Sequence, residues 1–287
     1  MRQRSATYQI APYPKARRAA SVAMRAFQRK PMMHGLIEVD VTRARALLRD
    51  HKARTGESLS FTAYLVTCLG KALDEYKFMQ AYRWGRKRLV IFDEVDVAII
   101  IERDVAGEKI PLIYVLRDVN HKTYRQIHQA IQACKTRPVT RSVLGFAGAP
   151  FLPTALLTGV LYRLLRTIPW LHKRVVGTVG VTSVGMFGQG GGWGIPVAGA
   201  TLAMTLGGLT EKPRIIEGRL ASREYLCVTL SFDHRIIDGA PAARFTSRLN
   251  QLIESGYGLD DLAAESRGHV EVEGSAETVR AQAPIGV

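Results

Sequence analysis

His234 and Asp238 lie four residues apart in segment 231–239, which reads SFDHRIIDG. The preceding residues 225–230 (YLCVTL) predict a buried strand. Pro241 is expected to open a helix, because apolar residues then recur on one helical face: Phe245, Leu249, Leu252 and Ile253. An imidazole takes up and releases protons near neutral pH, and a histidine at a strand exit can be rigid yet accessible. His234 is therefore a candidate general base, although the spacing alone also allows a structural histidine.

Four further segments carry recognisable motifs. Segment 17–24 reads RRAASVAM, 39–42 reads VDVT, 117–122 reads RDVNHK and 177–188 reads GTVGVTSVGMFG. Together with DHRIIDG at 233–239, they resemble, in the same order, the catalytic domain of the dihydrolipoamide acyltransferases of 2-oxo-acid dehydrogenase complexes. The chloramphenicol acetyltransferases have a similar His-x-x-x-Asp-Gly motif. Five matches in family order are not expected by chance.

The resemblance implies a fold and an activity. The expected fold class is α/β, a two-layer sandwich of the chloramphenicol-acetyltransferase-like type with a mixed sheet and helices. The expected activity is acyl transfer between thioester and thiol carriers, with coenzyme A as a substrate and a lipoyl group taking part only in trans. Family members form trimers with active sites between subunits, so a homotrimer is expected. A catalytically idle trimeric scaffold or interaction protein that keeps the acyltransferase core is the alternative.

The resemblance also implies roles for individual residues. A thiol has a pKa of about 8.5, so His234 would remove its proton as sulfur attacks the thioester carbonyl. Thr182 stands where the family has its oxyanion-stabilising serine, and a hydroxyl donor there can contribute about 3 kcal/mol. Ser183 takes this role if the register slips by one residue. The sequence alone equally allows both to be ordinary polar residues at a strand end.

Asp238 matches a family aspartate that forms an ion pair with an arginine of the first helix, which here would be Arg17. The resemblance thus implies a buried, orienting pair of Arg17 and Asp238. Gly239 is expected to allow a tight turn into the following helix. Asp233 and Arg235 flank the base and are expected only to set the loop. His34, near the family's Pro-His position, is a further candidate neighbour of the active site.

The charge of the chain is unevenly distributed. The net charge is +15, and segment 119–210 contains no acidic residue but many basic ones. Such a field suits an anionic partner: the phosphates of coenzyme A, as the resemblance implies, or an acidic carrier protein, a membrane surface or nucleic acid. The chain has no zinc-finger spacing and no RNA-binding signature, which argues against nucleic acid. A merely solvated basic face also remains open.

Cysteine and histidine spacing indicates neither disulfides nor a metal site. Three widely separated cysteines, Cys68, Cys134 and Cys227, suggest a reducing compartment. No apolar secretory segment occurs near the N-terminus, so a cytoplasmic protein is expected. The remaining histidines are expected at the surface without a metal: His51, His121, His128, His172 and His269.

One catalytic domain is expected over residues 1–264, followed by a flexible tail at 265–287. Neither a lipoyl nor a peripheral-subunit-binding domain is expected, so the acyl group would come from another carrier. Segment 143–172 resembles a hydrophobic insertion with a helix over 154–167, and its prolines and glycines argue against a membrane span. It is either an extra packed helix or an apolar surface for a long acyl chain, a partner or a membrane interface. The glycine-rich run 190–192 is expected to form a flexible loop beside the active-site strand.

Overall fold

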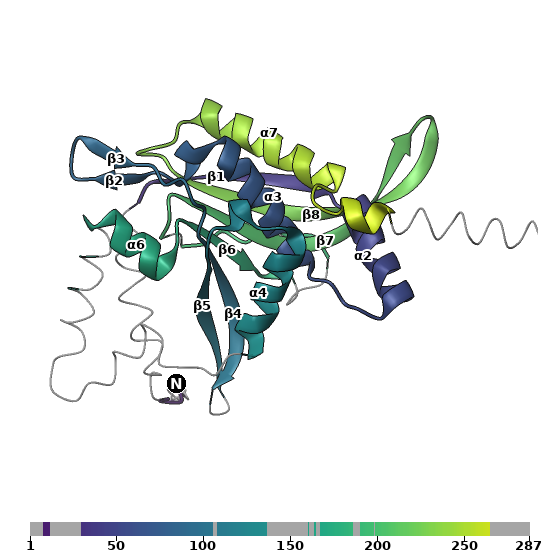
Figure 1. Ribbon diagram of the computed structural model, residues 1–287, viewed down its shortest axis with the longest axis horizontal. Helices are drawn as coiled ribbons and strands as arrows, with labels where there is room; N and C mark the ends of the chain where they lie inside the picture. The colour runs from purple at the N-terminus through teal and green to yellow at the C-terminus, as the bar shows by residue number, and fades with distance from the viewer. Residues whose placement is uncertain are drawn as a thin grey trace, which may run out of the picture.

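The computed structural model describes residues 8–11, 30–105, 108–136, 160, 164, 167–185, 190–197 and 199–264, with the backbone alone at 103–105 and 108–111. A six-stranded mixed sheet, in the order β1-β8-β7-β6-β4-β5, forms one layer of the molecule (Figure 1). Its strands are β1 (Met32–Asp40), β4 (Val97–Val105), β5 (Glu108–Leu116), β6 (Val179–Ser183), β7 (Leu202–Ile216) and β8 (Arg219–Asp233). Strand β6 is parallel to both of its neighbours, β4 and β7, and the other pairs are antiparallel.

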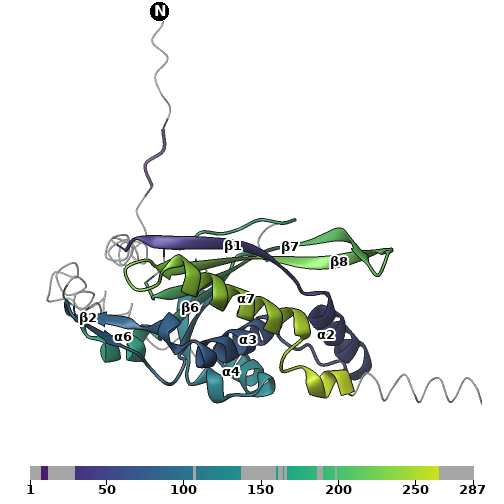
Figure 2. The ribbon, with the colours of Figure 1, turned by 90° about the horizontal axis from the view of Figure 1, so that it is seen from above.

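Helices form the second layer, and they lie on one side of the sheet (Figure 2). They are α2 (Thr42–Thr55), α3 (Phe61–Glu75), α4 (Tyr124–Thr136), α6 (Pro169–Val176) and α7 (Gly239–Ser255). A small hairpin of β2 (Tyr82–Trp84) and β3 (Arg88–Val90) lies beside α6. This arrangement confirms the predicted two-layer α/β class with a mixed sheet.

The core lies between the sheet and the helices. Alternate residues of β8 face the helices and are almost fully buried: Leu226, Val228, Leu230 and Phe232. Phe232 packs edge to face against Phe245 of α7, with ring centroids 6.2 Å apart. Helix α3 is buried on most of its surface, and Ser60 caps it by accepting a hydrogen bond from the Ala63 amide at 3.2 Å. Each such apolar side chain stabilises the fold by about 1.5–3 kcal/mol.

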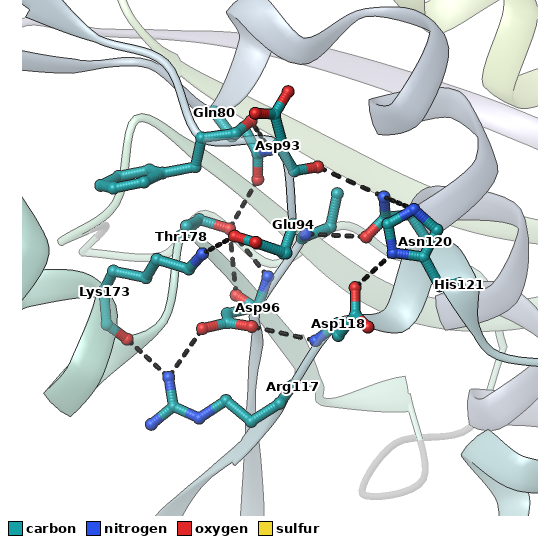
Figure 3. Close-up of polar contacts among 12 residues, drawn as sticks. Gln80, Asp93, Glu94, Asp96, Arg117, Asp118, Asn120, His121, Lys173 and Thr178 are labelled. Atoms are coloured by element: carbon teal, nitrogen blue, oxygen red, sulfur yellow. Dashed lines mark hydrogen bonds and ion pairs between the residues drawn. The ribbon is translucent and has the colours of Figure 1, made fainter.

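The strand register brings polar residues together at one end of the sheet. Asp96 is buried there, and its carboxylate accepts hydrogen bonds from the Arg117 guanidinium at 2.7 Å and from the Asp118 amide at 2.9 Å (Figure 3). Arg117 also donates to a backbone carbonyl of α6. Asn120 accepts from the Val95 amide at 2.8 Å. Segment 117–122 therefore joins β4, β5 and α6, which is a structural role.

Three of the histidines predicted at the surface are buried. His51, His128 and His172 are almost inaccessible, so that prediction was wrong for them, whereas His121 is exposed and His269 lies outside the described residues. Their burial depends on packing between segments that are far apart in the chain, so the local sequence pattern did not predict it. No group of metal-ligating side chains occurs in the described part of the chain. None of the helices described there is long and apolar enough to cross a membrane. All three cysteines are buried, and none forms a disulfide bond.

The buried His172 predicts acid sensitivity. Its Nδ1–H donates to the Gly177 carbonyl at 3.2 Å, and its ring lies 4.5 Å from that of Tyr82. Burial, together with the nearby positive charge of Lys30, lowers the pKa of His172 to about 4. Since this pKa is about 6.5 in the unfolded chain, the unfolded state binds more protons between pH 6.5 and 4. Stability should therefore be complete above pH 6.5 and fall by about 3 kcal/mol toward pH 4.

Thermal unfolding across this pH range, in the parent and in His172→Gln, would measure the contribution of this residue. The glutamine side chain does not titrate, so the variant should lose less stability on acidification than the parent. His121→Gln, which changes an exposed histidine, should behave like the parent. Parallel curves for the parent and His172→Gln would refute the prediction.

Candidate active site

The segment that carries the candidate base is a tight turn between β8 and α7. The Asp233 carbonyl, at the end of β8, accepts hydrogen bonds from the amides of Ile236 and Ile237 at 3.0 and 3.1 Å. The His234 amide donates to the Pro31 carbonyl at 2.9 Å, just before β1. Asp238 is the N-cap residue of α7. The backbone of His234 is thus held from both sides, as expected for a residue at a strand exit.

The His234 side chain has a defined orientation. Its Nδ1 lies 3.1 Å from the Ile237 carbonyl oxygen. Because a carbonyl oxygen can only accept, Nδ1 carries the proton of the neutral ring and Nε2 presents its lone pair. The side chain is 52% exposed. The ring therefore has the tautomer and the access that a general base requires.

Asp238 and Gly239 differ from the sequence expectation. The Asp238 side chain is 85% exposed, and its Oδ1 lies 3.7 Å from Nδ1 of His234. In the single chain this carboxylate therefore faces solvent, as a capping position at the molecular surface does. Arg17 lies outside the described residues, so the pair stays a prediction. Gly239 has no positive φ, and a Cβ there would contact nothing, so the turn itself does not require glycine.

Asp233 is the most buried charged group of the turn, with a side chain 1% exposed. Its carboxylate accepts two hydrogen bonds from the Arg235 guanidinium and one from the Arg235 amide. Burial alone would raise the pKa of Asp233, but the hydrogen bonds from Arg235 and the nearby charge of Lys30 outweigh it and hold this pKa below its usual range. The carboxylate is consequently ionised at neutral pH, and it fixes the loop as predicted.

His34 lies on the neighbouring strand and does not contact the base through any hydrogen bond of the described residues. It is opposite Ser231 in the β1–β8 ladder, and its Nδ1 lies 2.8 Å from the buried Ser231 hydroxyl. The sequence pattern placed it near the active site. The structure places it at the same end of the sheet as His234, paired with the strand that leads to the turn.

Thr182 and Ser183 form the last two positions of β6, and both are partly exposed. Val179 and Val181 face the helical layer, so strand alternation places Thr182 on the opposite face of the sheet. Thr182 is opposite Thr205 of β7, which is opposite Thr229 of β8. The hydroxyls of Thr205 and Thr229 are buried without a hydrogen-bond partner within the described structure.

Within one chain, the candidate hydroxyls of Thr182 and Ser183 lie far from the candidate base, His234. Thr182 is level with Thr229, and His234 follows Thr229 by five residues on a strand two positions away in the sheet. Five residues of strand span about 16 Å. The hydroxyls therefore lie nearer the middle of the sheet, away from the imidazole at its end. The sequence motifs gave no indication of this separation, which follows from the register.

The glycine-rich segment lies tightly against the sheet. The Gly208 amide donates to the Gly192 carbonyl at 2.9 Å, and the Trp193 indole donates to the Ile37 carbonyl of β1 at 3.0 Å. A Cβ on Gly207 would lie 2.1 Å from the Gly192 oxygen. The run thus packs against β7 and beside β1, in a close approach of backbones that only glycine permits, and not as the loose loop expected from the sequence.

Comparisons with known proteins identify the family of the chain. The family described as "2-oxoacid dehydrogenases acyltransferase (catalytic domain)" matches residues 5–143 and 174–259. The chain belongs to this family. The match includes the segments that carry His234, Thr182 and Arg17, and it is interrupted over residues 144–173, which nearly coincide with the stretch 143–172 interpreted as an insertion.

Known members of the acyltransferase family resemble the chain at low identity. The lipoamide acyltransferase component of the branched-chain alpha-keto acid dehydrogenase complex of Bacillus subtilis is 25% identical over 227 residues, which are 77% of this chain and 46% of that protein. The mitochondrial dihydrolipoyllysine-residue succinyltransferase component of the 2-oxoglutarate dehydrogenase complex of Saccharomyces cerevisiae is 33% identical over 84 residues, 29% of this chain and 18% of the relative. The chain spans about half or less of the length of these relatives.

Solved acyltransferase structures share the fold. A probable dihydrolipoamide acetyltransferase from Listeria monocytogenes superposes with a TM-score of 0.64 at 22% identity, covering 88% of this chain and 96% of that one. The dihydrolipoamide acetyltransferase of Azotobacter vinelandii gives a TM-score of 0.62 at 20% identity, covering 86% and 92%. These structures confirm the predicted fold type of the acyltransferase family.

Sequence reasoning missed Lys30 and Pro31, which contact the turn of the base. Lys30 Nζ lies 3.8 Å from the Asp233 carboxylate, and Pro31 accepts from the His234 amide. These residues are about 200 positions from His234 in the chain, and no motif marks them. Only the pairing of β1 with β8 brings them to the site.

Proposed function

We propose that the protein transfers an acyl group between thiol carriers, with His234 as the general base. The observation that carries the proposal is the orientation of this imidazole. Its Nδ1–H is held by the Ile237 carbonyl, so Nε2 is left as an accessible acceptor at a strand exit. A neutral imidazole in this tautomer can remove the proton of a thiol as the sulfur attacks. An idle scaffold would not need this arrangement.

The reaction proceeds through a tetrahedral intermediate. Nε2 accepts the thiol proton while sulfur forms a bond to the thioester carbonyl carbon, and the carbonyl oxygen becomes an oxyanion. A hydroxyl donor stabilises this charge, and Thr182 is the proposed donor, with Ser183 as the alternative. The intermediate then releases the original thiol, which takes the proton back from the imidazolium. Atoms and charge balance without a metal ion or a redox step.

A homotrimer would bring the two halves of this site together. Within one chain the base and the hydroxyl are separated by about 16 Å along the strands, so each site would combine His234 of one subunit with Thr182 of the next. The open space beside Gly239 and the exposed Asp238 side chain fit a surface that a neighbouring subunit or a substrate covers. One solved structure of similar fold is the cubic core of a pyruvate dehydrogenase multienzyme complex, with a TM-score of 0.61 at 20% identity, covering 86% of this chain and 92% of that one.

The Azotobacter vinelandii structure supports the assignment by the spacing of the residues, although it has an asparagine where this chain has Asp238. It was determined to examine a serine, a histidine and an asparagine in the catalytic mechanism, and that asparagine follows the histidine by four positions. Here Asp238 follows His234 by the same interval. We therefore assign Asp238 an orienting role beside the base, with Arg17 as its proposed partner.

The proposed substrates are coenzyme A thioesters and a second carrier thiol, either a lipoyl group on another protein or an acyl carrier. Segment 119–210 lacks acidic residues, which favours phosphate-bearing or acidic carriers. A cytoplasmic location stays a prediction from the sequence.

The function would be tested by measuring the release of free coenzyme A and the formation of acylated acceptor by chromatography. Acyl-CoA donors of increasing chain length would be combined with dihydrolipoamide, simple amines or alcohols. The proposal predicts release of coenzyme A that depends on both donor and acceptor. An intact trimer that transfers no acyl group with any pair would favour the idle scaffold.

The insertion is proposed to select the acyl group. Val160 and Leu164 are helical and partly exposed, and the Leu164 carbonyl accepts from the Ile168 amide, which leads into α6. We assign this apolar surface to the acyl chain, at the donor entrance near β6. Replacing residues 151–166 by a short Gly-Ser linker, with α6 kept intact, should shift the preference in kcat/KM from longer toward shorter acyl groups. An unchanged preference in a folded trimer would refute this assignment.

A further inference from the structure

Lys30 joins three elements at the end of the sheet that carries His234. Its Nζ donates to the backbone carbonyls of Gly199 and Ala200 at 2.5 and 3.3 Å, just before β7. The same Nζ lies 3.8 Å from the Asp233 carboxylate at the end of β8. The side chain is only 11% exposed. A lysine this buried has lost most of its hydration, so its position depends on these contacts.

Asp233 receives positive charge from two directions. Arg235 binds its carboxylate through the guanidinium and the amide, and Lys30 approaches from the side of β1 and β7. Arg235 is local, two residues away, whereas Lys30 is more than 200 residues away in the chain. Lys30 therefore adds a side-chain contact between the Asp233 carboxylate and a distant segment, beside the hydrogen bond of 2.9 Å from the Asp233 amide to the Thr201 carbonyl.

The contacts of Lys30 continue to the imidazole. Pro31, the next residue, accepts the hydrogen bond of the His234 amide. The Asp233 carbonyl holds the amide of Ile237, and the Ile237 carbonyl in turn holds Nδ1 of His234. The first route is the hydrogen bond of 2.9 Å between His234 and the residue next to Lys30. The second begins with the 3.8 Å ion pair of Lys30 and Asp233 and continues through two hydrogen bonds of 3.1 Å. A displacement of Lys30 would thus move Nε2 of His234, or break the hydrogen bond from Nδ1 to the Ile237 carbonyl that selects the tautomer.

We infer that Lys30 is a positioning residue for His234, acting through Asp233 and Pro31. The inference rests on the proposed function, because it takes His234 as the base. Lys30 does not touch the imidazole in the described structure, so its contribution is geometric. It aligns the base with the thiol. This alignment has a large effect on the reaction rate, because a shift of about 1 Å can lower the rate on the order of 10²-fold. No family motif quoted above includes this lysine.

Lys30→Met tests the inference, because methionine keeps the length of the chain and removes the ammonium group. We expect kcat to fall about 10-fold while KM changes less than about 2-fold, because the thiol still binds but His234 is no longer aligned with it. Lys30→Arg should recover most of the turnover. Lys212→Met is the matched control, because Lys212 forms an ion pair with Glu38 on the same sheet, away from the turn.

A double-mutant cycle separates positioning from general stability. In a His234→Ala background the base is gone, so Lys30→Met should lower the residual rate no further. Hydrogen–deuterium exchange of peptides that contain residues 233–237 provides a readout that needs no activity. Exchange there should become faster in Lys30→Met but not in Lys212→Met, and α7 should be unaffected.

Three results would overturn the inference. They are unchanged kcat and exchange in Lys30→Met, an equal loss of kcat in Lys212→Met, and the same further loss from Lys30→Met with and without His234. Full activity of His234→Ala would instead refute the proposed base, and the exchange experiment would still decide whether Lys30 holds the turn. The failure of the inference and that of the proposed function are thereby distinguishable.

Discussion

Replacing His234 by alanine is expected to abolish acyl transfer while the fold and the oligomeric state stay intact. General base catalysis contributes about 10²–10⁴-fold, and the thiol would lose its only proposed proton acceptor. The side chain is half exposed and makes a single described hydrogen bond, to the Ile237 carbonyl, so its removal should cost little stability. Release of coenzyme A, size-exclusion chromatography and thermal unfolding would measure the three properties.

His121→Ala is the matched control for this experiment. His121 is also exposed and lies beside a carboxylate, that of Asp118, but it is in the polar network around Asp96. Its loss should leave turnover within about 2-fold of the parent. Full activity in His234→Ala would remove the base from the mechanism.

Thr182→Val is expected to lower turnover by about 10²-fold with little change in KM. Valine keeps the shape of threonine and removes only the hydroxyl, which is proposed to bind the oxyanion. Because the oxyanion exists only near the transition state, the loss should appear in kcat. Steady-state kinetics with the best acyl-CoA donor would show whether the loss appears in kcat or in KM.

Three further variants would identify the residue that donates a hydrogen bond to the oxyanion. Thr182→Ser keeps a hydroxyl and should recover most of the turnover, whereas Ser183→Ala should have little effect. Thr205→Val changes the facing residue of β7, whose hydroxyl is buried, and should leave kcat nearly unchanged. A large loss in Ser183→Ala with normal turnover in Thr182→Val would assign the role to Ser183.

The fold class and much of the secondary structure could be predicted from the sequence. Apolar periodicity marked the helix that carries Phe245, Leu249 and Ile253, and the apolar run 225–230 marked the buried part of β8. These features are local, because they depend on residues within a few positions of each other. Element ends were less predictable: α7 begins at Gly239 and not at Pro241, and β8 continues to Asp233.

The arrangement of the site depended on long-range register. The motif predicted His234 and its turn, but the tautomer follows from the position of the Ile237 carbonyl, which only coordinates reveal. The contacts of Lys30 and the burial of His172 likewise join segments far apart in the chain. The separation of Thr182 from His234 is of the same kind, because a motif gives residue types and not distances.

Mixed trimers test the central claim, acyl transfer at a site shared by two subunits, most directly. His234→Ala and Thr182→Val subunits would be co-expressed, and coenzyme A release would be compared with that of each variant alone. A site built from His234 of one subunit and Thr182 of the next is intact where a Thr182→Val subunit supplies the base to a His234→Ala neighbour. Random assembly should then restore about a quarter of the parent turnover. A mixture no more active than the mean of the two variants would contradict the shared site.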